Sequence, residues 1–129
     1  NDLTDIRRIE KMLDDHEDRF IERCFTDEER ERAESGRDAG KHVDSYAKRF
    51  AAKEACAKAL GTGFRDGIYL RDIGVVNDED GRPSLKLSGG ADKRLFDMVP
   101  DGMRPVIHLT LTDEPPMASA FVIIEAVAV

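Results

Sequence analysis

The sequence contains little cysteine and no long run of apolar residues. Its two cysteines, Cys24 and Cys56, lie in segments predicted to be helical, and their spacing matches no metal-binding motif. We therefore predict two reduced, structural thiols in a cytoplasmic protein. No apolar stretch approaches the length of a membrane span, and no signal-peptide pattern is present, so we predict no association with a membrane.

Positive charge is in the minority, with 20 Lys and Arg against 27 Asp and Glu and a net charge of −7. This balance argues against general binding to nucleic acid or anionic membranes, but it permits a local basic patch. The 129 residues, 40% of them hydrophobic, suffice for one core but leave no room for a second. We therefore predict one domain spanning residues 1–129.

The alanine-rich segment 45–63 is predicted to form one long helix around which the rest of the chain is organised. Asp44 or Ser45 is the expected N-cap, and Gly61 fits the left-handed position past the helix end. Glu54 and Lys58 interrupt a helix face of mostly small apolar groups. A carboxylate on such a face is poorly solvated and needs a cation, either Lys58 through an ordinary helix pair or a metal.

The segment 6–25 has apolar residues at helical spacing and is predicted to be an amphipathic helix, with a possible break near Asp14 and Asp15. Its arginines alternate with acidic residues. From spacing alone, a solvated face with self-paired charges is at least as consistent as a binding patch. Thr26 and Glu29 form a capping-box pattern that predicts a second, short helix ending by Gly36.

Beyond Gly63 the pattern predicts strands. Two short strands around residues 73–76 and 83–87 flank a turn signal, and a short helix follows Gly89 and Gly90. Strands are then expected at 106–112 and 118–127, separated by a turn at 113–116. The last strand is almost continuously apolar, which is typical of a strand covered on both faces. This order predicts an α+β fold with a mainly antiparallel sheet packed around the central helix.

The segment Arg49-Phe-Ala-Ala-Lys-Glu-Ala-Cys-Ala-Lys-Ala-Leu-Gly-Thr-Gly63 resembles the helix signature of holo-acyl-carrier-protein synthases, the small bacterial 4′-phosphopantetheinyl transferases. Residues 1–10 resemble the aspartate-containing entry motif of that family, and segments 72–83 and 105–113 extend the likeness over nearly the whole chain. The resemblance implies transfer of 4′-phosphopantetheine from coenzyme A to a serine of acyl carrier protein, with release of 3′,5′-adenosine diphosphate, in fatty acid biosynthesis. It also implies a homotrimer with coenzyme A bound between subunits.

The resemblance assigns roles to individual residues. Asp2 and Glu54 match the carboxylates that hold Mg²⁺, and Glu54 and Lys58 match the catalytic pair. Three arginines of the first helix match those that grip the acidic recognition helix of the carrier protein: Arg8, Arg19 and Arg23. The residues implied to contact coenzyme A are Arg49, Lys53, Lys58, Gly61, Gly63, Pro83, His108 and Thr110. Because a metal-binding aspartate at position 2 needs a supporting strand, we also expect a short strand ahead of residue 1.

Several of these positions have other interpretations. A helix carboxyl end repels anions, so we interpret Gly61 as a cap that lets the chain approach a ligand closely. Alternation leaves open which face of its strand His108 occupies, and a structural histidine is the simpler reading. Asp113 replaces a histidine found in many relatives. Arg49 and Lys53 point to other sides of the helix from Glu54, so one ligand reaches all three only by wrapping the helix or at a subunit interface.

Two other functions fit parts of the sequence. A catalytically silent relative that binds carrier protein or nucleotide is disfavoured because Asp2, Glu54 and Lys58 are all present. A structural or oligomerising α+β domain, in which Glu54 and Lys58 merely form an ion pair, is the best alternative without the resemblance.

Overall fold

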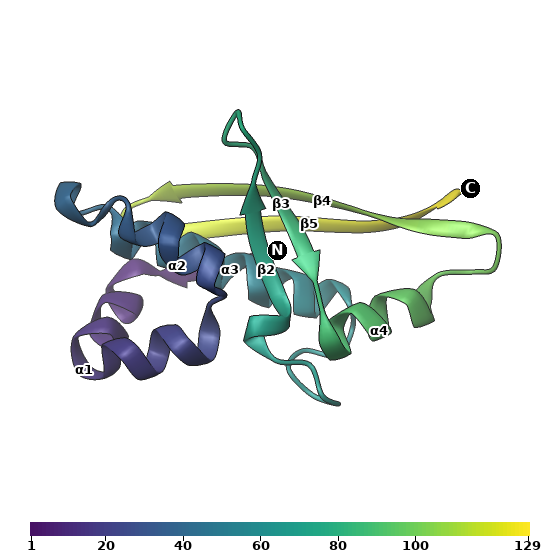
Figure 1. Ribbon diagram of the computed structural model, residues 1–129, viewed down its shortest axis with the longest axis horizontal. Helices are drawn as coiled ribbons and strands as arrows, with labels where there is room; N and C mark the ends of the chain where they lie inside the picture. The colour runs from purple at the N-terminus through teal and green to yellow at the C-terminus, as the bar shows by residue number, and fades with distance from the viewer.

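The computed structural model describes residues 1–129 as a set of helices packed against long antiparallel strands (Figure 1). The helices and strands are β1 (Asp2–Asp5), α1 (Ile6–Cys24), α2 (Asp27–Glu34), α3 (His42–Ala59), β2 (Ile73–Asn77), β3 (Pro83–Leu87), α4 (Gly89–Met98), β4 (Met103–Glu114) and β5 (Met117–Ala128). Short 3₁₀ turns lie at Arg37–Ala39 and Leu70–Asp72. None of the helices combines the length and apolar character needed to cross a membrane.

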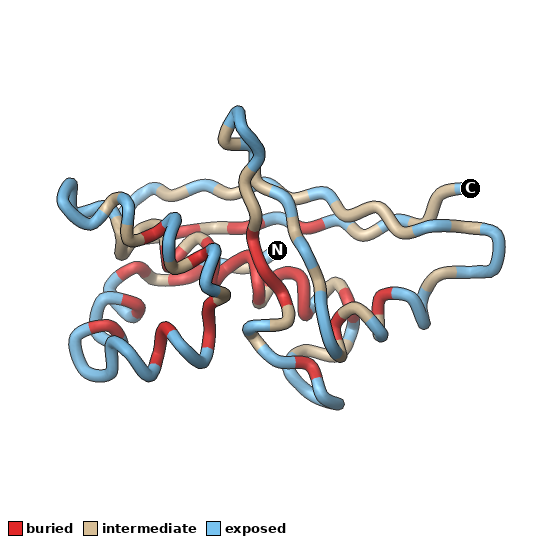
Figure 2. Tube along the Cα trace, in the orientation of Figure 1, coloured by how far each residue is buried: buried red, intermediate tan, exposed pale blue.

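The strands form two antiparallel sheets, one of order β1-β5-β4 and one consisting of the β2–β3 hairpin. Helix α3 packs along β5 and also contacts β1, β2 and β4, so it is the element shared by the whole molecule. The predicted α+β fold around a central helix is therefore confirmed. One apolar cluster joins α3 to β2, β5 and α4, and a second joins it to α1 and α2; both appear as the buried segments in Figure 2.

Local predictions in the first half are confirmed. The Thr26 hydroxyl accepts the Glu29 N–H and the Glu29 carboxylate accepts the Thr26 N–H, which completes the capping box that begins α2. Helix α1 is interrupted at His16, whose φ of −146° and ψ of 39° are not helical, just beyond the predicted break. Both cysteines are free and buried.

The start of α3 was predicted incorrectly. The helix begins at His42, its N-cap is Lys41 without a side-chain cap, and neither Asp44 nor Ser45 fills that role. The Ser45 hydroxyl instead accepts a hydrogen bond from Arg49. The preceding 3₁₀ turn ends at Gly40, whose φ is 71°, and the helix follows two residues later. The helix end agrees with expectation, since α3 finishes at Ala59 and Gly61 adopts a φ of 79°.

Within a single copy of the chain, the last strand is covered on one face only, not on both as expected. Ala120 and Val122 of β5 are buried under α3, whereas the alternate residues Phe121 and Ile123 are 49% and 47% exposed. The reason is that α3 covers only one face of the three-stranded sheet. The strands are also longer than predicted, and only Pro115 and Pro116 remain as the turn between β4 and β5.

Two backbone segments meet closely where the loop after α3 passes α4. A Cβ atom placed on Gly90 would lie 2.2 Å from the carbonyl oxygen of Gly67, a distance that no side chain tolerates. Ile68, the next residue of the loop, is buried in the same apolar cluster as Ala91. The glycine therefore lets α4 fix the loop that carries Phe64, Ile68 and Tyr69.

Candidate active site

The first strand and the central helix place the predicted acidic pair together. Asp2 lies at the start of β1, which pairs with β5, and α3 carries Glu54 and Lys58 on the side facing β1. The Lys58 ammonium donates to the Asp2 carboxylate at 2.7 Å and to the Asn1 carbonyl at 3.2 Å. The side chain of Asp2 is 9% exposed and that of Lys58 is 61% exposed, so this pair stands at the edge of the core. Lys58 thus pairs with Asp2 and makes no direct ion pair with Glu54.

The charges around Glu54 do not balance locally. Burial raises the pKa of the Glu54 carboxyl, and the neighbouring Asp2 carboxylate raises it further, while Arg8 and Lys58 act in the opposite direction. The hydrogen bond to Asp2 in turn raises the pKa of Lys58. Two carboxylates with one directly bonded ammonium leave an excess of negative charge that a bound cation would neutralise.

This donor set fits a magnesium ion. Mg²⁺ binds through one or two carboxylates and completes its octahedron with water and substrate phosphate oxygens. Asp2 and Glu54 supply two hard oxygen donors whose mutual repulsion a divalent cation relieves. No group of three or more acidic, histidine or cysteine side chains gathers into a protein cage here. Two carboxylates alone would leave most coordination positions of a Mg²⁺ ion for water or phosphate oxygens.

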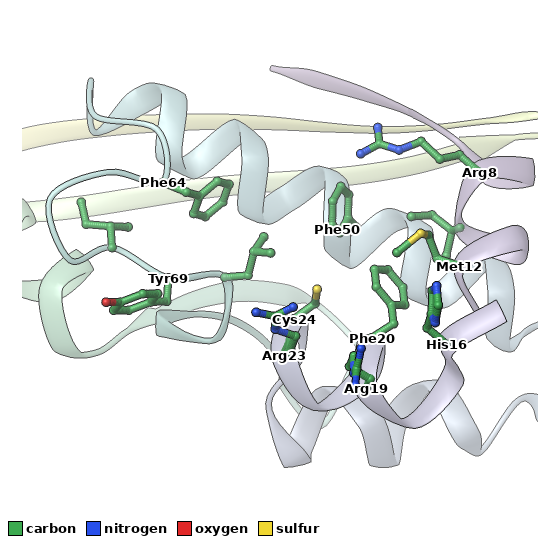
Figure 3. Close-up of a pocket in the computed structure, with 13 residues that line it drawn as sticks. Arg8, Met12, His16, Arg19, Phe20, Arg23, Cys24, Phe50, Phe64 and Tyr69 are labelled. Atoms are coloured by element: carbon green, nitrogen blue, oxygen red, sulfur yellow. The ribbon is translucent and has the colours of Figure 1, made fainter. Parts of the chain in front are cut away.

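A groove of about 590 Å³ lies beside this cluster, between α1, α3 and the loop after α3 (Figure 3). Its floor is mostly apolar and includes Phe20 and Phe50, while Phe64 and Tyr69 face it from the loop. All three arginines predicted to bind the carrier protein also line it, namely Arg8, Arg19 and Arg23. The Arg8 guanidinium lies 5.4 Å from the centre of the Phe50 ring and close enough to Glu54 to lower its pKa. Arg8 therefore connects the groove to the acidic cluster.

The acidic residues of α1 do not pair with the groove arginines. Their ion pairs are Asp15 with Lys11, Asp18 with Arg30 and Glu17 with Arg37. The alternative of a helix face with self-paired charges does not describe Arg8, Arg19 and Arg23, which have no ion-pair partner within the chain. The basic patch is thus available to an external acidic group.

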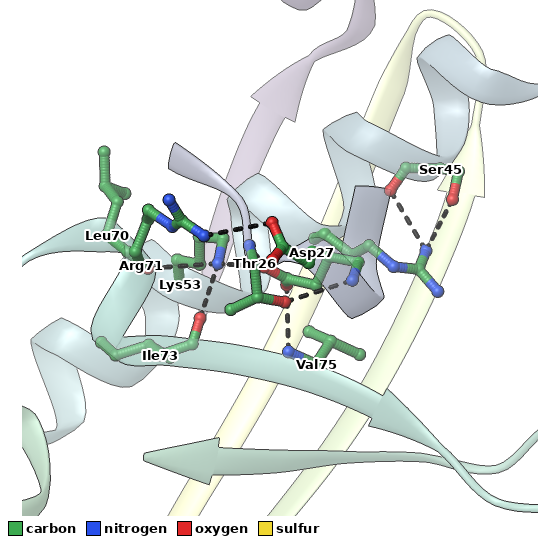
Figure 4. Close-up of polar contacts among 10 residues, drawn as sticks. Thr26, Asp27, Ser45, Lys53, Leu70, Arg71, Ile73 and Val75 are labelled. Carbon is green, nitrogen blue, oxygen red and sulfur yellow. Dashed lines mark hydrogen bonds and ion pairs between the residues drawn. The ribbon is translucent and has the colours of Figure 1, made fainter. Parts of the chain in front are cut away.

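Lys53 occupies an environment that does not fit the predicted contact with coenzyme A. Its side chain is 0% exposed, and its ammonium donates to Glu29 at 2.6 Å and to the carbonyl oxygens of Ile73 and Leu70 at 2.6 and 3.1 Å (Figure 4). Glu29 also accepts the Val75 N–H at 3.0 Å. The three donors of the ammonium are all used, so Lys53 ties α3 to α2 and β2 and does not face a ligand.

Arg49 is also buried in the single chain. Its guanidinium donates to the Ser45 hydroxyl at 2.7 Å and to the Asn77 side chain at 3.0 Å, and burial lowers its pKa. The Nε atom is buried without a partner. Arg49 therefore contacts the last residue of β2, Asn77. It lies on another side of α3 from Glu54, as its position along the helix predicts.

Three further predicted contacts lie apart from the acidic cluster. Pro83 and His108 line one cavity of about 380 Å³ between β3 and β4, together with Arg82. His108 lies on the exposed face of β4, with its Nε2 atom 2.6 Å from the Glu125 carboxylate, and Thr110 follows on the same face. Asp113, which replaces the family histidine, forms an ion pair with Lys48 at 3.0 Å.

The end of α3 reveals a residue that the sequence did not suggest. The Gly63 N–H donates to the Ala57 carbonyl at 3.1 Å, and the Leu60 carbonyl accepts from the Nε atom of Arg94, in α4, at 2.9 Å. Arg94 lies 34 residues from Leu60, so no local spacing indicates the contact.

The sequence profile of the 4′-phosphopantetheinyl transferase superfamily matches residues 1–110. The chain belongs to this superfamily. The transferase is 59% identical over 128 residues to a holo-acyl-carrier-protein synthase of Caulobacter sp. strain K31, covering 99% of this chain and 94% of that protein.

Solved structures agree with the assignment. The transferase matches the crystal structure of holo-acyl-carrier-protein synthase from Neisseria meningitidis with a TM-score of 0.79 and 35% identity, over 96% of this chain and 94% of that one. It matches the synthase of Bacillus anthracis strain Ames, solved in complex with CoA (3′,5′-ADP), with a TM-score of 0.71 and 34% identity, over 95% and 90% of the two chains.

Proposed function

We propose that this transferase moves 4′-phosphopantetheine from coenzyme A to a serine of acyl carrier protein, releases 3′,5′-adenosine diphosphate, and acts in the cytoplasm in fatty acid biosynthesis. The observation that carries the proposal is the Asp2, Glu54 and Lys58 cluster beside a groove lined by unpaired arginines. The family assignment and the relative solved with coenzyme A support the same reaction.

The reaction is attack of a serine hydroxyl on a diphosphate phosphorus, so it depends on charge neutralisation and alignment. Asp2 and Glu54 are the residues that would hold Mg²⁺, which when bound neutralises charge on the diphosphate oxygens. Lys58 places a second positive charge at the same point, and its exposed ammonium can reach the leaving phosphate. Arg8 lines the groove and also lowers the pKa of Glu54, so Glu54 is the proposed residue to orient the incoming hydroxyl.

The groove is the proposed docking surface for the carrier protein. Arg8, Arg19 and Arg23 present positive charge without internal partners in a chain of net charge −7. An acidic helix laid along α1 would neutralise them, and its apolar face would cover the aromatic floor. Because Arg8 also borders Glu54, a helix docked here brings its serine toward the acidic cluster.

We propose that the transferase is a homotrimer in which neighbouring copies complete the coenzyme A site. The open face of the three-stranded sheet exposes Leu3 at 67% together with Phe121 and Ile123, an apolar surface that a second copy would bury. His108 and Thr110 lie on this same face, away from the Asp2 cluster of their own chain. A neighbouring subunit is the simplest way for both sets of residues to serve one ligand.

Mass spectrometry tests the proposed function. Apo acyl carrier protein is incubated with coenzyme A and Mg²⁺, and the carrier mass is expected to increase by one phosphopantetheine only when the transferase is added. Chelation of the metal should stop the increase, and added Mg²⁺ should restore it. Carrier binding without any mass gain would favour a catalytically silent relative. Light scattering on the pure protein measures its molar mass and so tests the trimer independently of activity.

A further inference from the structure

The end of α3 presents an electrostatic problem for the proposed coenzyme A site. Gly61 and Gly63 lie just past the helix end, where the carbonyl groups and the helix dipole disfavour an anion. Coenzyme A carries a diphosphate and a 3′-phosphate. A phosphate near Gly61 therefore needs a positive charge that α3 itself supplies only through Lys58, whose ammonium is bonded to Asp2.

Arg94 provides a positive charge at this point. Its Nε atom donates to the Leu60 carbonyl at 2.9 Å, which neutralises one of the last acceptors of α3. Its Nη2 atom lies 3.6 Å from the position that a Cβ on Gly61 would occupy, so the guanidinium covers the glycine directly. Neither Nη nitrogen has a hydrogen-bond partner within the chain, and neither is a buried, unsatisfied atom.

We propose that Arg94 binds a phosphate group of coenzyme A, an inference that rests on the proposed function. The guanidinium is a planar fork, so one edge can hold a carbonyl while the other donates to phosphate oxygens. Gly61 lacks a side chain and leaves the space beside the Nη atoms open to the ligand. Arg94 and Lys58 then contribute charge from two different helices, α4 and α3.

Three variants separate the charge of Arg94 from its structural contact. Arg94→Gln removes the charge, Arg94→Lys keeps it without the fork, and Lys93→Gln removes a charge from the neighbouring residue of α4, which pairs with Asp97. Calorimetry with the full-length protein measures binding of coenzyme A, 3′,5′-adenosine diphosphate and 3′-dephospho-coenzyme A. Thermal unfolding is recorded for every variant.

Arg94→Gln is expected to weaken coenzyme A binding about tenfold, the size of one hydrogen bond to a charged group. Arg94→Lys should regain part of this loss, and Lys93→Gln should bind as the wild type does. The KM for coenzyme A should rise in Arg94→Gln while the KM for carrier protein stays constant. A loss that disappears with 3′-dephospho-coenzyme A assigns the contact to the 3′-phosphate, and a loss that remains assigns it to the diphosphate.

Wild-type affinity in Arg94→Gln would overturn the proposal. So would equal losses in the Gln and Lys variants accompanied by equal drops in Tm, since these would mark a helix cap alone. A wild-type protein that binds coenzyme A but transfers nothing overturns the proposed function and leaves the Arg94 test intact. One that does not bind coenzyme A overturns both.

Discussion

Lys53 and Glu54 are consecutive residues of α3, yet the chain treats their charges in opposite ways. The Lys53 ammonium is fully buried and has three acceptors at 2.6 to 3.1 Å. Glu54 is only partly buried and lies beside Asp2, a second carboxylate, which raises its pKa in addition to burial. A rotation of about 100° between neighbouring helix residues directs one charge toward α2 and β2 and the other toward β1.

The difference shows how a single helix separates structure from function. The buried ion pair is saturated by fixed partners, so it orders the fold and has no capacity for a ligand. The cluster of Asp2, Glu54 and Lys58 has more negative than positive charge, so it is completed only by something from outside the chain. We expect substitutions in the first region to change stability and those in the second to change activity.

The largest effect is expected from Lys53→Met. Removing the ammonium leaves Glu29 charged and fully buried, so the free energy of unfolding should fall by about 3–5 kcal/mol. Urea denaturation measures the loss. Lys58→Met is the comparison on the same helix: its ammonium is 61% exposed, so its loss should cost much less stability than that of Lys53 while abolishing transfer.

A second variant, Lys53→Met with Glu29→Gln, sharpens this result. The amide removes the unpaired charge and keeps one oxygen, which can accept either the Thr26 or the Val75 N–H, while the other N–H then faces the amide NH₂ group. Part of the lost stability should return. Equal stability of the single and double variants would mean that the buried charge is not what destabilises the protein.

Glu54→Gln should reduce transfer by about a hundredfold or more, because metal-bound charge stabilisation amounts to several kcal/mol. The amide keeps the size of the side chain but not the charge that a hard cation requires. Circular dichroism and Tm should stay at wild-type values, and Mg²⁺ should raise the Tm of the wild type only. Metal-dependent transfer at the wild-type rate would remove Glu54 from the site.

Arg23→Glu should raise the KM for carrier protein about tenfold and leave the KM for coenzyme A unchanged, because repulsion replaces attraction in the groove. Arg8→Glu should affect the carrier too, but Arg8 also neighbours Glu54, so Arg23 gives the cleaner test. Lys11→Glu, on the same helix outside the groove, is the control. A carrier KM that ignores both Arg23→Glu and salt would exclude this docking surface.

The partly exposed ion pair of Glu34 and Arg37 is expected to have the smallest effect on stability. The hydrogen bond from Arg37 lowers the pKa of Glu34, so its contribution to stability is present above the ordinary value near 4.5 and is lost as the pH falls through the lowered pKa. Glu34→Gln should cost no more than about 1 kcal/mol at pH 7. Denaturation curves between pH 7 and about pH 3 should converge for the two proteins. A difference that grows in acid would contradict this sign.

The features that the sequence predicts well are those decided by near neighbours. The capping box joins residues three apart, Gly61 ends α3 by its own backbone, and the β2–β3 turn lies within one short segment. Glu29 shows the limit of such reasoning. Its partners beyond the cap are Lys53 and the Val75 N–H, 24 and 46 residues away, and no local pattern pairs them.

The candidate site divides in the same way. Helical periodicity places Glu54 and Lys58 on one face. It shows on which side of the helix a side chain lies, but not which residues from other parts of the chain pack there. The resemblance assigns Lys53 to coenzyme A, and no local pattern predicts its burial, because a fully buried lysine is rare and its partners are distant in sequence. The contact of Arg94 with Leu60 also spans 34 residues, so the sequence gives no sign of it. Strand alternation does not decide which face of β4 carries His108, whereas its contact with Glu125 does. The roles of Asp2, Glu54 and Lys58 remain predictions.

The contact of Gly90 with the Gly67 carbonyl has a consequence for the interpretation of natural variants. Any side chain at position 90 must push away the backbone that carries Phe64, Ile68 and Tyr69, which form one wall of the groove. Gly90 does not itself line the groove, so its position alone does not mark it as part of the docking surface. A substitution at Gly90 should nevertheless weaken binding of the carrier protein, because it displaces one wall of the groove while the protein still folds.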